Sequence, residues 1–167
     1  MKKLIVLLLV LTVLSLAACS PAAPSSQTQP TQPSTEAAPV ELDLQAIYDE
    51  CAKTMPEMIP LDATMMLNYC GIKAEDCAVA VVAICSDGLR TDEIWLIEAV
   101  DAAALDRLAA MADARLQAKG EESISYSPEQ YAVVQKAKVI RFGNYLAVLV
   151  SPDVDTLETV FNTAAGI

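Results

Sequence analysis

Hydrophobic residues follow three different patterns along this chain. Residues 4–18 form a nearly continuous apolar run behind two lysines. Residues 20–40 contain almost no large apolar side chains and hold five of the nine prolines. In residues 41–167, apolar positions recur at helix or strand spacing. We therefore expect a single folded domain at 41–167, because 127 residues are enough for one core and too few for two.

The first part of this domain has the pattern of two helices. Apolar residues recur at helical spacing over 44–55, and Pro56 is expected to end that helix. Asp62 stands where it can cap a second, short helix, which Gly71 is placed to end.

A strand pattern follows. The runs CAVAVVAIC (77–85) and DEIWLIEAV (92–100) are rich in β-branched residues, and the Asp87-Gly88 pair between them is typical of a hairpin turn. Asp101 is placed to cap a long helix, whose end is expected at Lys119-Gly120.

The second half of the domain repeats this order of elements. Ser127 is placed to cap another helix, with proline at the first helical position and Gln130 three residues after the cap. The strand patterns KAKVIRF (136–142) and YLAVLVS (145–151) flank a Gly143-Asn144 turn, and Ser151-Pro152-Asp153 opens a last helix. The sequence thus predicts an α+β fold: two β-hairpin-plus-helix units forming a four-stranded, mainly antiparallel sheet with helices packed on one face, preceded by one or two N-terminal helices.

The expected strands are apolar on both alternations. In 77–85, for example, both sets of alternating side chains are Ala, Val, Ile or Cys. A second sheet face of this kind requires cover, either from the N-terminal helices, from a second copy or from a partner.

The end of the first apolar run resembles the lipobox of bacterial lipoproteins. Leu16, Ala17 and Ala18 precede Cys19, and the 15 apolar-rich residues up to Ala18 are too few for a membrane-spanning helix. This resemblance implies a signal peptide at 1–18 that is removed and acyl chains attached to Cys19. The alternative is an ordinary secretory signal with an incidental cysteine. Residues 19–40 then form a disordered tether, and the localisation implied is the extracytoplasmic face of the cell membrane.

Charge narrows the class of partner. After removal of residues 1–18, nine basic residues face 22 acidic ones, a net charge of −13. A surface this acidic disfavours binding to nucleic acid. It also disfavours attachment to anionic lipids through a basic surface. Membrane attachment is therefore expected to depend on the acyl chains.

Four cysteines lie in the domain: Cys51, Cys70, Cys77 and Cys85. Cys77 and Cys85 lie at the two ends of one expected strand, too far apart for a disulfide. The spacings match no zinc motif, and the chain has no histidine. Buried free thiols are the preferred interpretation, and disulfides remain the alternative.

The sequence offers little for catalysis. Without histidine, the ordinary neutral-pH base and the common nucleophilic triads are missing. The carboxylate pairs Asp92-Glu93 and Glu121-Glu122 are interpreted as solvated surface, and the loop with Ser86 and Asp87 lacks the EF-hand pattern for calcium. We expect no catalytic residue, no metal and no cofactor.

Trp95 is the residue that stands out for recognition, because tryptophan is enriched at binding hot spots. Two interpretations are open. The indole either contacts a partner or fills the core beneath the long helix.

The segments TDEIWLIEA (91–99), YSPEQ (126–130) and GNYLAVLVSPD (143–153) resemble an uncharacterised lipoprotein domain of Gram-positive anaerobes, domain of unknown function 4358. The resemblance implies a small lipid-anchored domain and supplies no site residues. The preferred hypothesis is a non-enzymatic module that binds an envelope protein or itself through the uncovered face of the sheet. A solute- or wall-polymer-binding lipoprotein and, less favoured, a carboxylate-dependent hydrolase are the alternatives.

Overall fold

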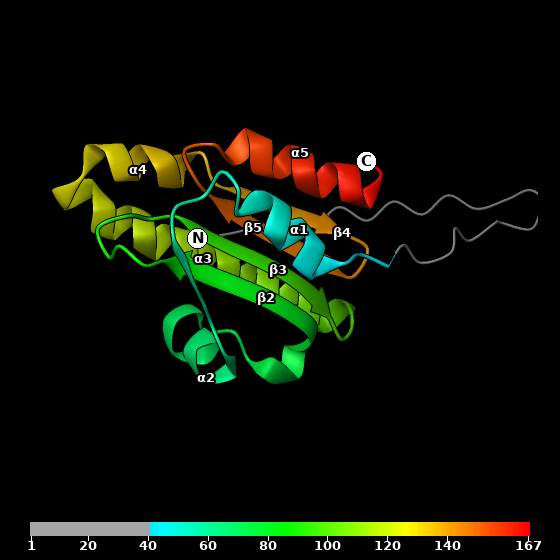
Figure 1. Ribbon diagram of the computed structural model, residues 1–167. Coiled ribbons are helices and arrows are strands. Elements are labelled where there is room, and N and C mark those ends of the chain that lie inside the picture. Colours follow the sequence, from blue (N-terminus) through cyan, green and yellow to red (C-terminus); the bar gives the residue numbers. More distant parts are fainter. Residues whose placement is uncertain (1–40) are drawn as a thin grey trace, which may run out of the picture. The chain divides into compact units, whose positions relative to one another are not determined.

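A computed structural model describes residues 41–167, so the predictions for the signal peptide 1–18, for Cys19 and for the tether 19–40 lie outside the described residues. Figure 1 shows the elements along the chain. In order they are α1 (Leu44–Cys51), β1 (Met58–Pro60), α2 (Ala63–Met65), the π-helical turn η1 (Met66–Cys70), the short 3-10 turn η2 (Ala74–Asp76), β2 (Cys77–Cys85), β3 (Glu93–Ala99), α3 (Ala102–Tyr126), α4 (Pro128–Gln135), β4 (Lys138–Phe142), β5 (Tyr145–Val150) and α5 (Val154–Ala165).

The strands form one antiparallel sheet in the order β1-β2-β3-β5-β4. Both predicted hairpins, β2-β3 and β4-β5, are confirmed. The prediction of four strands was wrong, because β1 pairs with the end of β2 and adds a fifth. Three residues ending in Pro60 carry almost no strand signal, yet an edge position tolerates a proline that cannot donate to the ladder.

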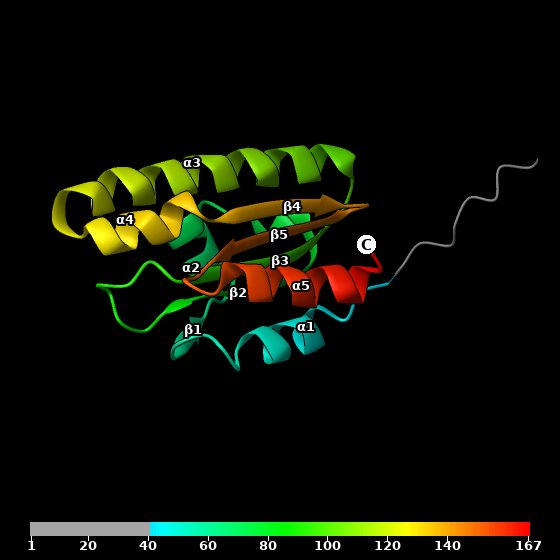
Figure 2. The ribbon, with the colours of Figure 1, turned by 90° about the horizontal axis from the view of Figure 1, so that it is seen from above.

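Helices cover both faces of the sheet, which corrects the prediction of helices on one face. Figures 1 and 2 show α3 on one side of the strands and α1 and α5 on the other. Trp95 and Ile97 of β3 pack on the α3 side, whereas Ile94 and Leu96 pack on the α1 and α5 side. The physical reason is the apolar composition of both strand alternations, which needs a helical layer on each face.

The predicted helix caps are largely confirmed. The carboxylates of Asp62 and Asp101 and the hydroxyl of Ser127 each accept a hydrogen bond from a backbone N–H in the first turn of α2, α3 and α4. Gly71 takes a left-handed conformation (φ 74°) directly after η1. These ends depend on local chemistry, which explains why the sequence predicts them.

Two predicted helix ends were wrong. The first helix ends at Cys51 rather than at residue 55, and a turn leads on toward Pro56. The long helix continues through Gly120 to Tyr126. Gly120 lies against the side chains of Tyr131 and Val134 in α4, so it marks a helix contact rather than a helix end.

Among residues 41–167, no helix combines the length and the apolar composition that crossing a bilayer requires.

Candidate functional site

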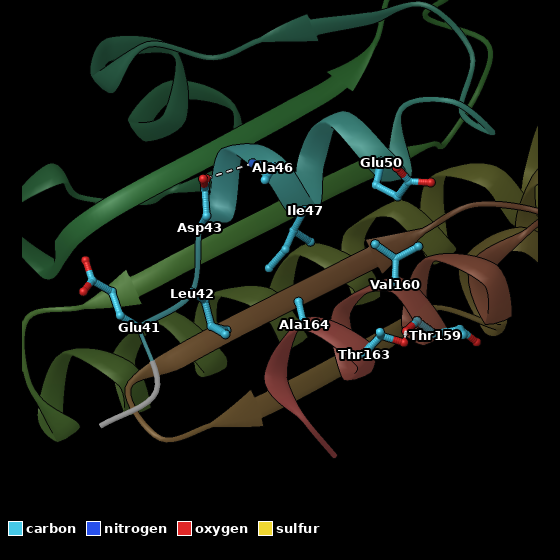
Figure 3. Close-up of a pocket in the computed structure, with 10 residues that line it drawn as sticks. All are labelled: Glu41, Leu42, Asp43, Ala46, Ile47, Glu50, Thr159, Val160, Thr163 and Ala164. Carbon is cyan, nitrogen blue, oxygen red and sulfur yellow. Dashed lines mark hydrogen bonds between the residues drawn. The ribbon is translucent and has the colours of Figure 1, made fainter. Parts of the chain in front are cut away.

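An apolar groove of about 410 Å³ lies between α1 and α5 (Figure 3). Leu42 and Ile47 are buried beneath it, and Val160 of α5 is half-buried. Ala46 and Ala164 are exposed along its sides. Small and branched apolar side chains thus leave an opening between the two helices that an apolar group can enter.

Local structure fixes both walls of the groove. Asp43 Oδ1 accepts a hydrogen bond from the backbone N–H of Ala46 at 2.9 Å and caps α1. The backbone N–H of Leu42 donates to the hydroxyl of Tyr145 on β5 at 3.2 Å. Leu157 and Phe161 bury the inner face of α5 in the core. The groove is therefore built on two helices and on the segment before α1, which the bond between Leu42 and Tyr145 anchors.

The rim of the groove is acidic. Glu41 and Glu50 stand at its two ends in Figure 3, and Asp43 lies between them in sequence. Among the ten described residues that line the groove, none is basic. The hydroxyls of Thr159 and Thr163 already donate to backbone carbonyls within α5. A partner segment with an apolar side chain next to a positively charged one would match both the apolar interior and the acidic rim of the groove.

A second feature is a cluster of buried charges at the start of β3. Glu93 Oε2 lies 2.9 Å from Nη2 of Arg115 and 2.8 Å from Nζ of Lys119, both on α3. Glu93 Oε1 accepts a hydrogen bond from the indole Nε1 of Trp95 at 2.7 Å, and the Cys70 thiol lies 3.7 Å away. The cluster thus joins β3 to α3 and to η1.

The electrostatics of this cluster keep Glu93 ionised. Burial alone would raise the pKa of Glu93, but the positive charge of Lys119 and the hydrogen bonds from Arg115 outweigh it and lower the pKa below its ordinary value of 4.5. A carboxylate held in this way accepts a proton poorly. The arrangement suits a structural tie better than a catalytic acid or base.

The side chain of Trp95 has no exposed surface through which it could contact a partner. The side chain is 0% exposed and packs beneath α3, so the structure places it in the core, as the second interpretation of the sequence expected. The four cysteines within residues 41–167 are free thiols, three of them buried and Cys77 half-buried.

The expectation for the first carboxylate pair was wrong. Asp92 and Glu93 are each 1% exposed, whereas Glu121 and Glu122 are exposed as predicted. Burial is tolerated because Arg90, Arg115 and Lys119 supply opposite charge. Within residues 41–167, no group of three or more Cys, Asp or Glu side chains is placed to hold a metal ion.

The groove was missed at the level of sequence. Its two walls lie more than 100 residues apart, and each appears in the sequence as an ordinary amphipathic helix. The local signal that could have drawn attention to it is the segment Glu41-Leu42-Asp43, where acidic and apolar residues alternate just before α1.

Comparison with known proteins gives a single assignment. Residues 51–151 match the model of a family described as "Domain of unknown function (DUF4358)". No curated protein and no solved structure matches the chain significantly. The matched segment runs from the last residue of α1 to the end of β5, and so includes the whole sheet and the Glu93 cluster. Because the match spans more than half of the chain, the protein belongs to the DUF4358 family.

Proposed function

We propose that this protein is a lipoprotein that is anchored to the cell membrane through acyl chains on Cys19 and faces the extracytoplasmic side. In this proposal its folded domain binds an envelope protein and catalyses no reaction. The single observation that carries the binding role is the apolar, acid-rimmed groove between α1 and α5.

The chemistry of the groove defines the partner. An apolar side chain can fill the space over Leu42 and Ile47, while lysine or arginine beside it pairs with Glu41, Asp43 or Glu50. A second copy of this chain is a poor occupant, because it carries the same net charge of −13 after removal of residues 1–18. The groove therefore favours a different protein with a basic, apolar contact segment.

The absence of catalysis is supported by composition and by the state of Glu93. The chain contains no histidine, and Glu93, one of the buried carboxylates, is engaged by Arg115, Lys119 and Trp95. A binding role requires neither a histidine nor a carboxylate that is free to exchange a proton.

The anchor can be tested separately from the groove. A Cys19→Ala precursor should lose incorporation of a labelled fatty acid and should leave the membrane fraction, because no acceptor thiol remains at the lipobox. A Cys51→Ala precursor serves as the control and should keep both properties. Fatty-acid labelling of the Cys19→Ala protein would overturn the anchor assignment.

The groove is tested by placing a photo-crosslinking residue at Ala46 in the full lipoprotein in its native envelope. Ala46 is exposed beside the groove, and Ala114, exposed on α3, is the matched control position. We expect a discrete cross-linked protein from position 46 and none from position 114. The same product from both positions, or no product from position 46, would contradict a partner site at the groove.

A further inference from the structure

A small, partly enclosed pocket of about 150 Å³ lies between the loop after β2 and the C-terminal half of α3. The loop supplies Arg90 and Asp92, and α3 supplies Arg115, Lys119 and Glu122. Tyr126, half exposed at the end of α3, also lines it. No residue of this pocket lines the groove between α1 and α5, so the two sites are separate.

Asp92 gives the pocket an unsatisfied negative group. Its side chain is 1% exposed, and its Oδ2 accepts a hydrogen bond from Nε of Arg90 at 3.0 Å. Its Oδ1 is buried and has no hydrogen-bond partner among residues 41–167. Leaving a buried acceptor unpaired costs free energy, so this oxygen favours a ligand that brings a hydrogen-bond donor.

Two cations of α3 line the pocket. Arg115 and Lys119 share the single carboxylate of Glu93. Lys119 also donates to the backbone carbonyl of Thr91 at 2.9 Å. Arg115 donates to Glu93 through Nε and Nη2, which leaves its Nη1 without a hydrogen-bond partner within the described part of the chain. The unused donor of Arg115, with Lys119 beside it, is available to a ligand anion.

Charges of both signs in so small a pocket define the class of ligand. A purely anionic ligand would meet Asp92 and Glu122, and a purely cationic one would meet Arg115 and Lys119. A volume of about 150 Å³ is also below the few hundred Å³ typical of pockets for drug-sized molecules.

We propose that this pocket binds the zwitterionic head of a free α-amino acid. The ammonium group donates to Oδ1 of Asp92 after a small movement of the side chains that cover this oxygen, and the carboxylate of the ligand accepts from Arg115 and Lys119. Glu122 adds negative charge at the pocket, and the side chain of the ligand lies toward Tyr126. This site goes beyond the partner-binding role proposed for the groove and does not depend on it.

The test is calorimetric titration of the mature chain carrying Cys19→Ser, with glycine, L-alanine and D-alanine as probes. Propionate and ethylamine are matched controls, because each keeps one half of the alanine head. We expect saturable binding of at least one of the amino acids, and binding weaker by about tenfold or more for both half-ligands. No saturable binding of any of the three, or propionate binding as tightly as alanine, would overturn the proposal.

Two variants test the assignment of residues. Asp92→Asn should weaken amino-acid binding by about tenfold or more, and Glu122→Gln should weaken it to a smaller extent. Asp113→Asn, at an exposed position of α3, should leave binding unchanged. Circular dichroism checks that each variant is folded. Glu122 is exposed, so its variant keeps the test valid if Asp92→Asn disturbs the loop. Unchanged affinity in every folded variant of the pocket would contradict the assignment.

Discussion

The indole nitrogen of Trp95 donates a 2.7 Å hydrogen bond to Oε1 of Glu93, and both side chains are buried in the same core. The two residues are neighbours on one side of β3, where Glu93 also meets Arg115 and Lys119. A residue that stands out in the sequence as a recognition candidate thus completes the hydrogen bonding of a buried carboxylate. The relationship makes Glu93 a centre of stability rather than of surface chemistry.

Glu93→Gln should destabilise the fold by about 3 kcal/mol, because it leaves Arg115 and Lys119 without their shared counter-charge in a largely buried position. Urea denaturation followed by circular dichroism measures the free energy of unfolding. Glu98→Gln, on the same strand and half-buried, is the matched control and should change that free energy by less than about 0.5 kcal/mol. Equal effects of the two substitutions would contradict the role assigned to Glu93.

The same cluster predicts a dependence of stability on pH. The pKa of Glu93 is lower in the folded state than its ordinary value of 4.5, so its contribution is fully present above that value and is lost as the pH falls through the folded-state pKa. The difference in unfolding free energy between the wild type and Glu93→Gln should therefore be constant near neutral pH and shrink below pH 4.5. A difference that grows on acidification would contradict a lowered pKa of Glu93 in the folded state.

Gly120→Ala should stabilise the protein, by up to about 1 kcal/mol, because residue 120 lies inside α3 and alanine has the higher helix propensity. The added Cβ would lie 3.8 Å from Tyr131, an ordinary van der Waals contact. Gly71→Ala is the opposite case. It should destabilise the fold, since residue 71 has a φ of 74°. Thermal unfolding of the two variants distinguishes them, and destabilisation by Gly120→Ala would show that the contact with α4 does not accept a Cβ at residue 120.

The cysteines should differ in reactivity toward iodoacetamide. Burial is the largest cause that raises the pKa of Cys51 to about 11 and that of Cys70 to about 12, so both hold few thiolates at neutral pH. Cys77 is half-buried and should be alkylated first in the folded protein carrying Cys19→Ser. Mass spectrometry of the modified peptides gives the order, and alkylation in urea provides the control in which all four react. Alkylation of folded Cys70 as fast as Cys77 would contradict the burial described.

Local signals explain what could be predicted from the sequence. The Asp87-Gly88 and Gly143-Asn144 pairs are turn signals, and the runs beside them form the two hairpins, while Asp101 and Ser127 cap helices through bonds to nearby backbone groups. Each of these signals lies within a short stretch of neighbouring residues.

Features that depend on distant contacts could not be predicted in this way. β1 is a strand only because β2 lies beside it, and Glu93 is tolerated in the core only because α3 brings Arg115 and Lys119 to it. Apolar residues on both alternations indicated that the second sheet face needs cover but did not say what covers it. The groove likewise exists only once α1 and α5 lie side by side.

The most direct test of the groove as a partner site is a binding measurement. The partner identified by cross-linking at residue 46 is titrated with the purified mature domain and with its Ala46→Arg variant. Arginine fits the helix and places bulk and positive charge at the groove, whereas Ala114→Arg makes the same change on exposed α3. We predict that Ala46→Arg weakens binding by about tenfold or more, that Ala114→Arg leaves it unchanged, and that added salt weakens binding to the wild type. Equal affinity of all three proteins for that partner would contradict the groove as its binding site.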